Sequence, residues 1–190
     1  MCGIAGFSLF NFNEGGETSL EAMHKAIHHR GPDASGMYID EHIGLCHRRL
    51  SILDLSEAGN QPMYSKEGDL VIVFNGEIYN FLELRAELEN DGVIFKSHTD
   101  TEVILELYAR EGTKCLDKLN GMFAFALWDK NKQELFIARD RLGKKPLYYF
   151  NDNGRFAFGS EIKAILALEN IPREIRLDAV YDFFAYQYVP

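Results

Sequence analysis

The second residue of the chain, Cys2, is the side chain best placed for nucleophilic chemistry. It follows Met1 directly, and its small side chain permits removal of the preceding methionine. Removal would leave a free α-amino group, with an ordinary pKa of about 8, beside the thiol. Such an amine can act as general base for its own side chain, so no histidine is required. From position alone, however, the stronger interpretation is a small apolar residue at the start of a strand.

Asn75 and Gly76 follow an apolar run over residues 70–74 and could supply two hydrogen-bond donors. Nucleophilic attack on a carbonyl group produces an oxyanion, which an asparagine side-chain amide and a backbone N–H can stabilise together. Glycine also lets a ligand approach the backbone closely. Read alone, the Asn-Gly pair is more typical of a turn.

Charged side chains in nearby segments could bind an amino-acid-like molecule. Arg48 and Arg49 are neighbours in a predicted strand and point to opposite faces, so one of them can point inward and hold a carboxylate in a bidentate fork. Asp100, before a predicted helix, and Glu77 could each bind an ammonium group. The alternatives are solvated arginines, a helix N-cap at Asp100 and a solvated loop residue at Glu77.

The histidines give a weaker signal. His24 and His28 lie four residues apart on a predicted helix, which matches one half of a zinc-binding pattern. The glutamate of an HExxH motif and a nearby cysteine are both missing, so we expect no metal site. Cys46 and His47 adjoin in a predicted strand and point to opposite faces, which argues against a catalytic pair.

Composition excludes several classes of function. The 190-residue chain has a net charge of −9 and no long run of Lys or Arg, so we expect no nucleic-acid partner. Three cysteines without CxxC spacing favour a reducing cytoplasm over a disulfide framework. The sequence has no signal peptide and no apolar stretch long enough to span a membrane, so we expect no membrane partner. One basic cluster is interpreted as a solvated loop: Arg139, Arg141, Lys144 and Lys145.

The spacing of apolar residues predicts helices and antiparallel strands that are grouped in runs, which indicates an α+β fold rather than a regular βαβ alternation. Helices are predicted over residues 18–29, 80–90, 101–111, 161–168 and 178–186. Strands are predicted over residues 4–10, 36–39, 43–52, 70–74, 122–128, 135–139, 147–150 and 155–159. Turn residues predict hairpins at 129–133 and 151–154.

A set of nine segments identifies a resemblance. They occur in the order MCGIAGF, HHRGPDASG, HRRLSILD, GNQPM, VFNGEIYN, SHTDTEVI, LNGMFAFALWD, ARDRLGKKPLYY and FGSEIKAI. Together they resemble the glutaminase domain of class II glutamine amidotransferases, above all that of the glutamine-hydrolysing asparagine synthetases. Each segment is weakly specific alone, but the ordered set is highly specific. The resemblance covers residues 1–170, and residues 171–190 resemble a linker and the start of a C-terminal synthetase domain.

The resemblance implies a four-layer αββα sandwich, in which two antiparallel sheets lie between helices, as in N-terminal nucleophile hydrolases. It also implies an enzyme that hydrolyses glutamine to glutamate and ammonia through a thioester on Cys2. Asn75 and Gly76 would form the oxyanion hole, and Arg49 would hold the carboxylate of glutamine. Glu77 and Asp100 would bind the ammonium group of glutamine, with assistance from backbone groups of Leu50 and Ile52.

The same resemblance sets the expected cofactors and partners. We expect no cofactor for this domain, because the ATP-binding SGGxDS-type loop of the synthetase domain is absent from the sequence. ATP and magnesium are expected only in that further domain, which would use the ammonia to make asparagine from aspartate. A homodimer is compatible with the sequence. The alternatives are an amidotransferase that serves a different acceptor, in a sugar or cell-surface polysaccharide pathway, and a noncatalytic glutamine-binding module.

Overall fold

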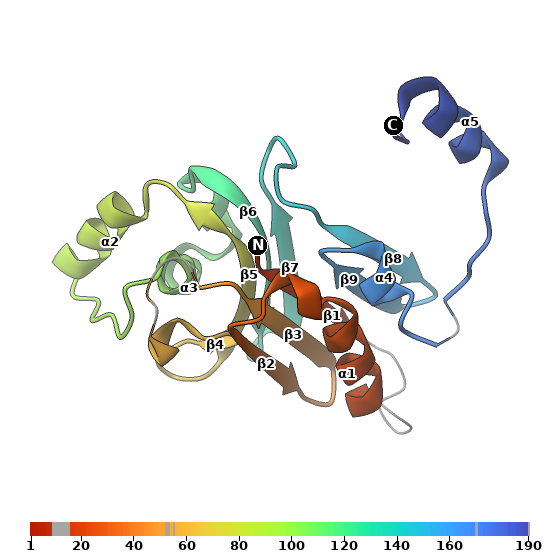
Figure 1. Cartoon of the computed structure of the whole chain (residues 1–190). Coiled ribbons are helices and arrows are strands. Elements are labelled where there is room, and N and C mark those ends of the chain that lie inside the picture. The colour runs from red at the N-terminus through yellow and green to blue at the C-terminus, as the bar shows by residue number, and fades with distance from the viewer. Residues whose placement is uncertain (9–15, 52–53, 55, 170, 190) are drawn as a thin grey trace.

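Two antiparallel sheets form the centre of the computed structural model, which describes residues 1–8, 16–51, 54, 56–169 and 171–189 (Figure 1). The first sheet has five strands in the order β2-β3-β1-β9-β8, and the second has four in the order β4-β5-β6-β7. The strands of the first sheet are β1 (Gly3–Ser8), β2 (Ala34–Ile39), β3 (Ile43–Arg49), β8 (Tyr148–Asp152) and β9 (Arg155–Gly159). Those of the second are β4 (Met63–Tyr64), β5 (Leu70–Ile78), β6 (Gly121–Asp129) and β7 (Glu134–Arg139).

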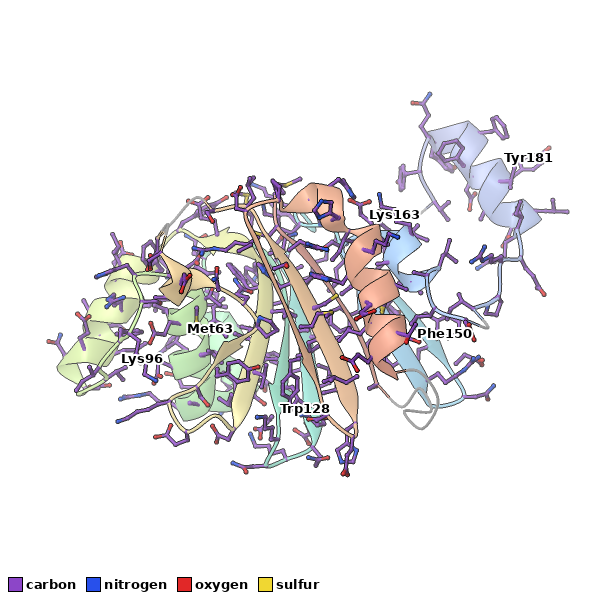
Figure 2. The ribbon with its side chains drawn as sticks, turned by 60° about the horizontal axis from the view of Figure 1, so that its bottom comes forward. Met63, Lys96, Trp128, Phe150, Lys163 and Tyr181 are labelled. Atoms are coloured by element: carbon purple, nitrogen blue, oxygen red, sulfur yellow. The ribbon has the colours of Figure 1, made fainter. Side chains whose placement is uncertain are left out.

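Helices cover the outer face of each sheet, which confirms the expected αββα layering (Figure 2). On the first sheet lie α1 (Gly16–Ala26) and α4 (Ile162–Ile165). On the second sheet, α3 (Asp100–Glu111) packs against β5, and α2 (Phe81–Asn90) packs against α3. Short 3₁₀ segments are η2 (His28–Arg30), η3 (Glu57–Gly59) and η4 (Gly112–Asp117).

The last helix, α5 (Leu177–Tyr186), has no buried residue and stands apart from the two-sheet body (Figure 1). Its Tyr181 side chain lies far from the body in Figure 2. The predicted division between residues 1–170 and residues 171–190 stays a prediction. Over the part of the chain that the structure describes, no helix is long and apolar enough to cross a membrane.

The apolar run at the start of β5 shows why the layers form. Val71 and Val73 pack between the two sheets, whereas Ile72 and Phe74 pack toward α3 on the other face of the strand. Side chains of a strand alternate between faces, so a strand buried on both faces is apolar at every position. Trp128 of β6 completes the intersheet core, and its indole N–H donates to Asp40 Oδ2 at 2.9 Å.

Most predicted elements are confirmed within a few residues, and two differences matter. The predicted helix over residues 18–29 ends at Ala26 and is followed by η2. The strand predicted over residues 70–74 continues to Ile78, because β6 pairs with it as far as the Ile78–Gly121 pair. Residues 9–10 of the first predicted strand and residue 52 of the third lie outside the described residues. Both hairpin turns are confirmed, and Gln133 and Asn153 adopt positive φ there.

Candidate active site

A cavity of about 90 Å³ gathers side chains from the ends of several elements. Cys2 precedes β1, Arg49 ends β3, Asn75 lies in β5, and Asp100 begins α3. All four were predicted from the sequence as site residues, and all four line this one cavity. Gly76, Glu77 and Leu50 line it too. Ile52 lies outside the described residues, so its predicted role stays a prediction.

Cys2 presents a half-buried thiol at the edge of the cavity. Because β1 pairs with β3 from Gly3 and Arg48 onward, Cys2 lies beside the residues that follow β3. The backbone N–H of Leu50 donates to Cys2 Sγ at 3.4 Å, and Sγ lies 3.6 Å from the carbonyl oxygen of Leu50. These contacts with the backbone of Leu50 hold the sulfur at the edge of the cavity.

The two other cysteines are unsuited to nucleophilic chemistry. Cys46 and Cys115 are fully buried, and burial raises the pKa of their thiols to about 12 and about 11. The thiolate is the reactive form, so these groups remain inert at neutral pH. Cys2 is therefore the cysteine that the fold leaves accessible.

Met1 lies in the cavity beside Cys2. Its Sδ is 3.6 Å from Lys145 Nζ, and its peptide bond to Cys2 occupies the nitrogen that would become the α-amino group. Arg30 Nε donates to the carbonyl oxygen of Cys2 at 2.9 Å and fixes the backbone on the other side of the thiol.

Asn75 and Gly76 lie inside β5, paired with Ala124 and Phe123 of β6. The turn alternative for this dipeptide is therefore wrong. Asn75 is 1% exposed, and its Nδ2 has no hydrogen-bond partner among the described residues. A buried amide donor without a partner is costly, so an amide left in this state beside a cavity points to a ligand that accepts its hydrogen bond.

Glycine is required at position 76 by the close approach of β6. A Cβ atom there would lie 2.5 Å from the carbonyl oxygen of Met122 and 2.7 Å from Phe123 Cα. The absence of a side chain also leaves the backbone of β5 open to the cavity at the residue after Asn75.

Asp100 and Glu77 give this end of the cavity a negative character. Asp100 is 4% exposed, and its Oδ2 accepts the N–H of Ile78 at 2.9 Å. Burial raises the pKa of Asp100 to about 6, and the nearby charge of Glu77 adds to the effect. Thr99, and not Asp100, is the N-cap of α3, because its hydroxyl accepts the N–H of Glu102. The N-cap alternative for Asp100 is therefore wrong.

Arg49 is the inward-pointing arginine of the pair, 6% exposed, whereas Arg48 Nε donates to the carbonyl of His24 on the α1 side. The guanidinium of Arg49 contacts residues 54, 56 and 60, on either side of η3. Its Nη1 donates to the carbonyl of Ser56 and to Asn60 Oδ1, each at 2.8 Å, and Nη2 donates to the carbonyl of Asp54.

Several residues that line the cavity escaped prediction, and Lys145 and Gln61 are two of them. Lys145 was assigned to a solvated loop, but it is 7% exposed, and its backbone N–H donates to Asp140 at 3.0 Å. The prediction of a solvated loop is therefore wrong for Lys145. A run of basic residues in the sequence does not indicate that one of them is buried by tertiary contacts. Gln61 is 8% exposed and lies within the GNQPM segment, whose resemblance was noted without a role for this side chain.

Two of the histidines, His24 and His47, are buried and contact backbone carbonyl groups. His24 Nε2 bonds to the carbonyl oxygen of His47 at 3.2 Å, and His47 Nε2 bonds to that of Phe74 at 3.1 Å. Across the described residues, no group of three or more His, Cys, Asp or Glu side chains could hold a metal ion.

Comparison with known proteins shows which fold this geometry uses. Glutamine phosphoribosylpyrophosphate amidotransferase from Bacillus subtilis aligns with a TM-score of 0.75 at 22% identity, over 87% of this chain and 43% of its own. At that identity the likeness concerns the fold alone. The amidotransferase fold predicted from the sequence is thus confirmed.

Relatives found by sequence share a higher identity with this chain than that structure does. The putative asparagine synthetase [glutamine-hydrolyzing] 2 of Methanocaldococcus jannaschii is 45% identical over all of this chain and 40% of its own length. Asparagine synthetase [glutamine-hydrolyzing] 1 of Bacillus subtilis is 43% identical over all of this chain and 30% of its own. The chain therefore spans less than half the length of these relatives. The glutamine amidotransferase domain family matches residues 1–190, and the chain belongs to that family.

Proposed function

We propose that this domain hydrolyses the side-chain amide of glutamine to glutamate and ammonia, with Cys2 as nucleophile. The observation that carries the proposal is the unpartnered Asn75 Nδ2, which is buried beside the cavity that also contains the Cys2 thiol. A nucleophile and an unpartnered hydrogen-bond donor for an oxyanion in the same cavity are the groups that acyl transfer from an amide requires. Membership of the glutamine amidotransferase domain family supports glutamine as the amide.

The reaction begins after Met1 is removed. The α-amino group of Cys2 then takes the proton of the thiol, and the thiolate attacks the side-chain carbonyl carbon of glutamine. The oxyanion accepts hydrogen bonds from Asn75 Nδ2 and the N–H of Gly76. The C–N bond breaks, the protonated amine returns its proton to the leaving ammonia, and a glutamyl thioester remains. Water then attacks the thioester, which releases glutamate and restores the thiol.

The two ends of the cavity would hold the amino-acid part of glutamine. Asp100 and Glu77 would bind its ammonium group, because they place negative charge at the start of α3. Arg49 would bind its carboxylate, which would replace the loop carbonyls of Asp54 and Ser56 that the guanidinium now contacts. Backbone groups of Leu50 and Ile52 would assist.

We propose that the ammonia passes to a synthetase domain that makes asparagine. The printed names of the Methanocaldococcus and Bacillus relatives support this acceptor. ATP and magnesium would be needed there and not at the Cys2 cavity. We place the reaction in the cytoplasm, because all three cysteines are free thiols.

The test is glutamate release by the purified chain, whose mass first establishes that Met1 is absent. Cys2→Ala should abolish release, whereas Cys115→Ala should retain it because Cys115 is buried in the core and does not line the cavity. Acid quenching during turnover with labelled glutamine should trap label on the unaltered chain and on Cys115→Ala, and none on Cys2→Ala. Substantial release by the Cys2→Ala variant would refute the proposal.

A further inference from the structure

The backbone N–H and C=O of Phe74, directly before Asn75, are bonded by side chains and not by a neighbouring strand. The N–H and C=O of one residue in an antiparallel strand point to the same side. On one side β5 pairs with β6, and on the other β4 reaches only to the Met63–Ile72 and Tyr64–Val71 pairs. The Phe74 peptide groups therefore lie beyond the end of β4.

Gln61 and His47 form hydrogen bonds with the backbone N–H and C=O of Phe74. Gln61 Oε1 accepts the N–H of Phe74 at 2.6 Å, and His47 Nε2 lies 3.1 Å from the carbonyl oxygen. A carbonyl can only accept, so His47 carries its proton on Nε2. Burial lowers the pKa of His47 to about 3, which keeps the ring neutral in this role.

The other end of the Gln61 side chain reaches α3. Its Nε2 donates to Thr101 Oγ1 at 3.2 Å, and Thr101 follows Asp100 directly. Gln61 and Thr101 are 8% and 2% exposed, so water does not replace this contact. One side-chain amide thus connects the strand that carries Asn75 with the helix that begins at Asp100.

We propose that Gln61 is a positioning residue that sets the spacing between Asn75 and Asp100. The inference rests on the proposed function, because those two residues would bind the reacting amide and the ammonium group at opposite ends of glutamine. Gln61 acts through Phe74 and Thr101. A small displacement of a donor at an oxyanion hole is costly, because its stabilisation depends on preorganised geometry.

Variants of Gln61 and Thr101 separate the effect of the Phe74 hydrogen bond from the effect of the contact with α3. Gln61→Leu keeps a similar volume and removes both hydrogen bonds, so kcat should fall about tenfold or more and KM should rise. Thr101→Val removes only the contact with α3, so KM should rise while kcat is retained. Gln61→Glu still accepts from the Phe74 N–H and can accept from the Thr101 hydroxyl, so it should recover most of kcat.

Ser65→Ala is the matched control. Ser65 Oγ accepts the N–H of Leu70 at 3.0 Å, which is the same kind of bond at the far end of the same strand. This variant should lower the melting temperature and leave kcat and KM within about twofold. Activity is measured for each chain below its own melting transition, after its mass confirms that Met1 is absent.

The outcomes distinguish this inference from the proposed function. Loss of kcat in Gln61→Leu, recovery in Gln61→Glu and retention in Ser65→Ala would support positioning by Gln61. If all four variants, including Thr101→Val, had the kcat and KM of the unaltered chain, the positioning role would be overturned and the proposed function would stand. Absence of glutamate release from the unaltered chain would overturn the proposed function. Hydrogen exchange at the Phe74 amide would then decide the link: Gln61→Leu should accelerate it about tenfold or more, and unchanged exchange would overturn the inference.

Discussion

Asp100→Asn should make the protein more stable at neutral pH while it removes the carboxylate that we propose as the partner of the ammonium group. Asp100 is 4% exposed at the first turn of α3, and burial raises its pKa to about 6. At pH 7.5 the carboxylate is ionised in a place that disfavours charge. Asparagine has nearly the same shape and keeps an oxygen that can accept the N–H of Ile78.

The magnitude follows from the linkage between protons and folding. Raising the pKa of a carboxyl from 3.8 to about 6 corresponds to a folding penalty on the order of 3 kcal/mol when the group is ionised. The protonated group carries no such penalty, so the stability it allows is fully present below pH 3.8 and is lost as pH rises through 6. The favourable position of a carboxylate at a helix N-terminus, about 0.3–1 kcal/mol, is too small to reverse the sign.

Urea unfolding of both chains at pH 7.5 and at pH 4 measures the effect. Asp100→Asn should raise the free energy of unfolding at pH 7.5 by up to about 3 kcal/mol, and the difference should shrink toward zero at pH 4. A variant that is no more stable than the parent at pH 7.5 would refute the view that burial dominates at this carboxyl. Its KM for glutamine should rise whichever way its stability changes.

Asp129→Asn is a control variant whose expected effect on the free energy of unfolding at pH 7.5 has the opposite sign. Burial acts to raise the pKa of Asp129, but hydrogen bonds from the side chain and N–H of Lys132 and the N–H of Asn131 outweigh it and lower the pKa. Its stability contribution is therefore present above its ordinary pKa and lost as pH falls. Asp129→Asn should destabilise the protein at pH 7.5 and leave the KM for glutamine unchanged.

Three further predictions follow from the cavity. Asn75→Ala should lower kcat about 10²–10³-fold with little change in KM, measured by glutamate release, and a loss below tenfold would argue against an oxyanion donor. Gly76→Ala should destabilise the fold by about 1–3 kcal/mol in thermal unfolding, because its Cβ would meet the backbone of Met122 and Phe123; an unchanged melting temperature would show that β6 can move aside. The KM for glutamine should rise as pH falls below about 6, because protonated Asp100 loses its charge; a flat KM from pH 7.5 to pH 5 would exclude Asp100 as the ammonium partner.

Features set by local sequence could be predicted, whereas features set by contacts between distant segments could not. The helix at Asp100–Glu111 was predicted almost to the residue, because its apolar positions repeat at helical spacing. The layering of the two sheets came from the resemblance, since periodicity within an element does not say which faces meet. The inward position of Lys145 and the two contacts of Gln61 depend on segments far apart in the chain, so local pattern contains no trace of them.

The error at β5 is the most informative about the site. The strand was predicted to end at Phe74 because Asn75, Gly76 and Glu77 interrupt an apolar run, yet β6 pairs through all three. A polar residue in a buried strand conflicts with local patterning, and natural proteins keep such conflicts chiefly where function requires them. Asn75 costs stability as a buried donor without a partner, and a bound oxyanion would repay that cost. The polar interruption was thus a wrong signal of a strand end, whereas the site that it indicates stays a prediction.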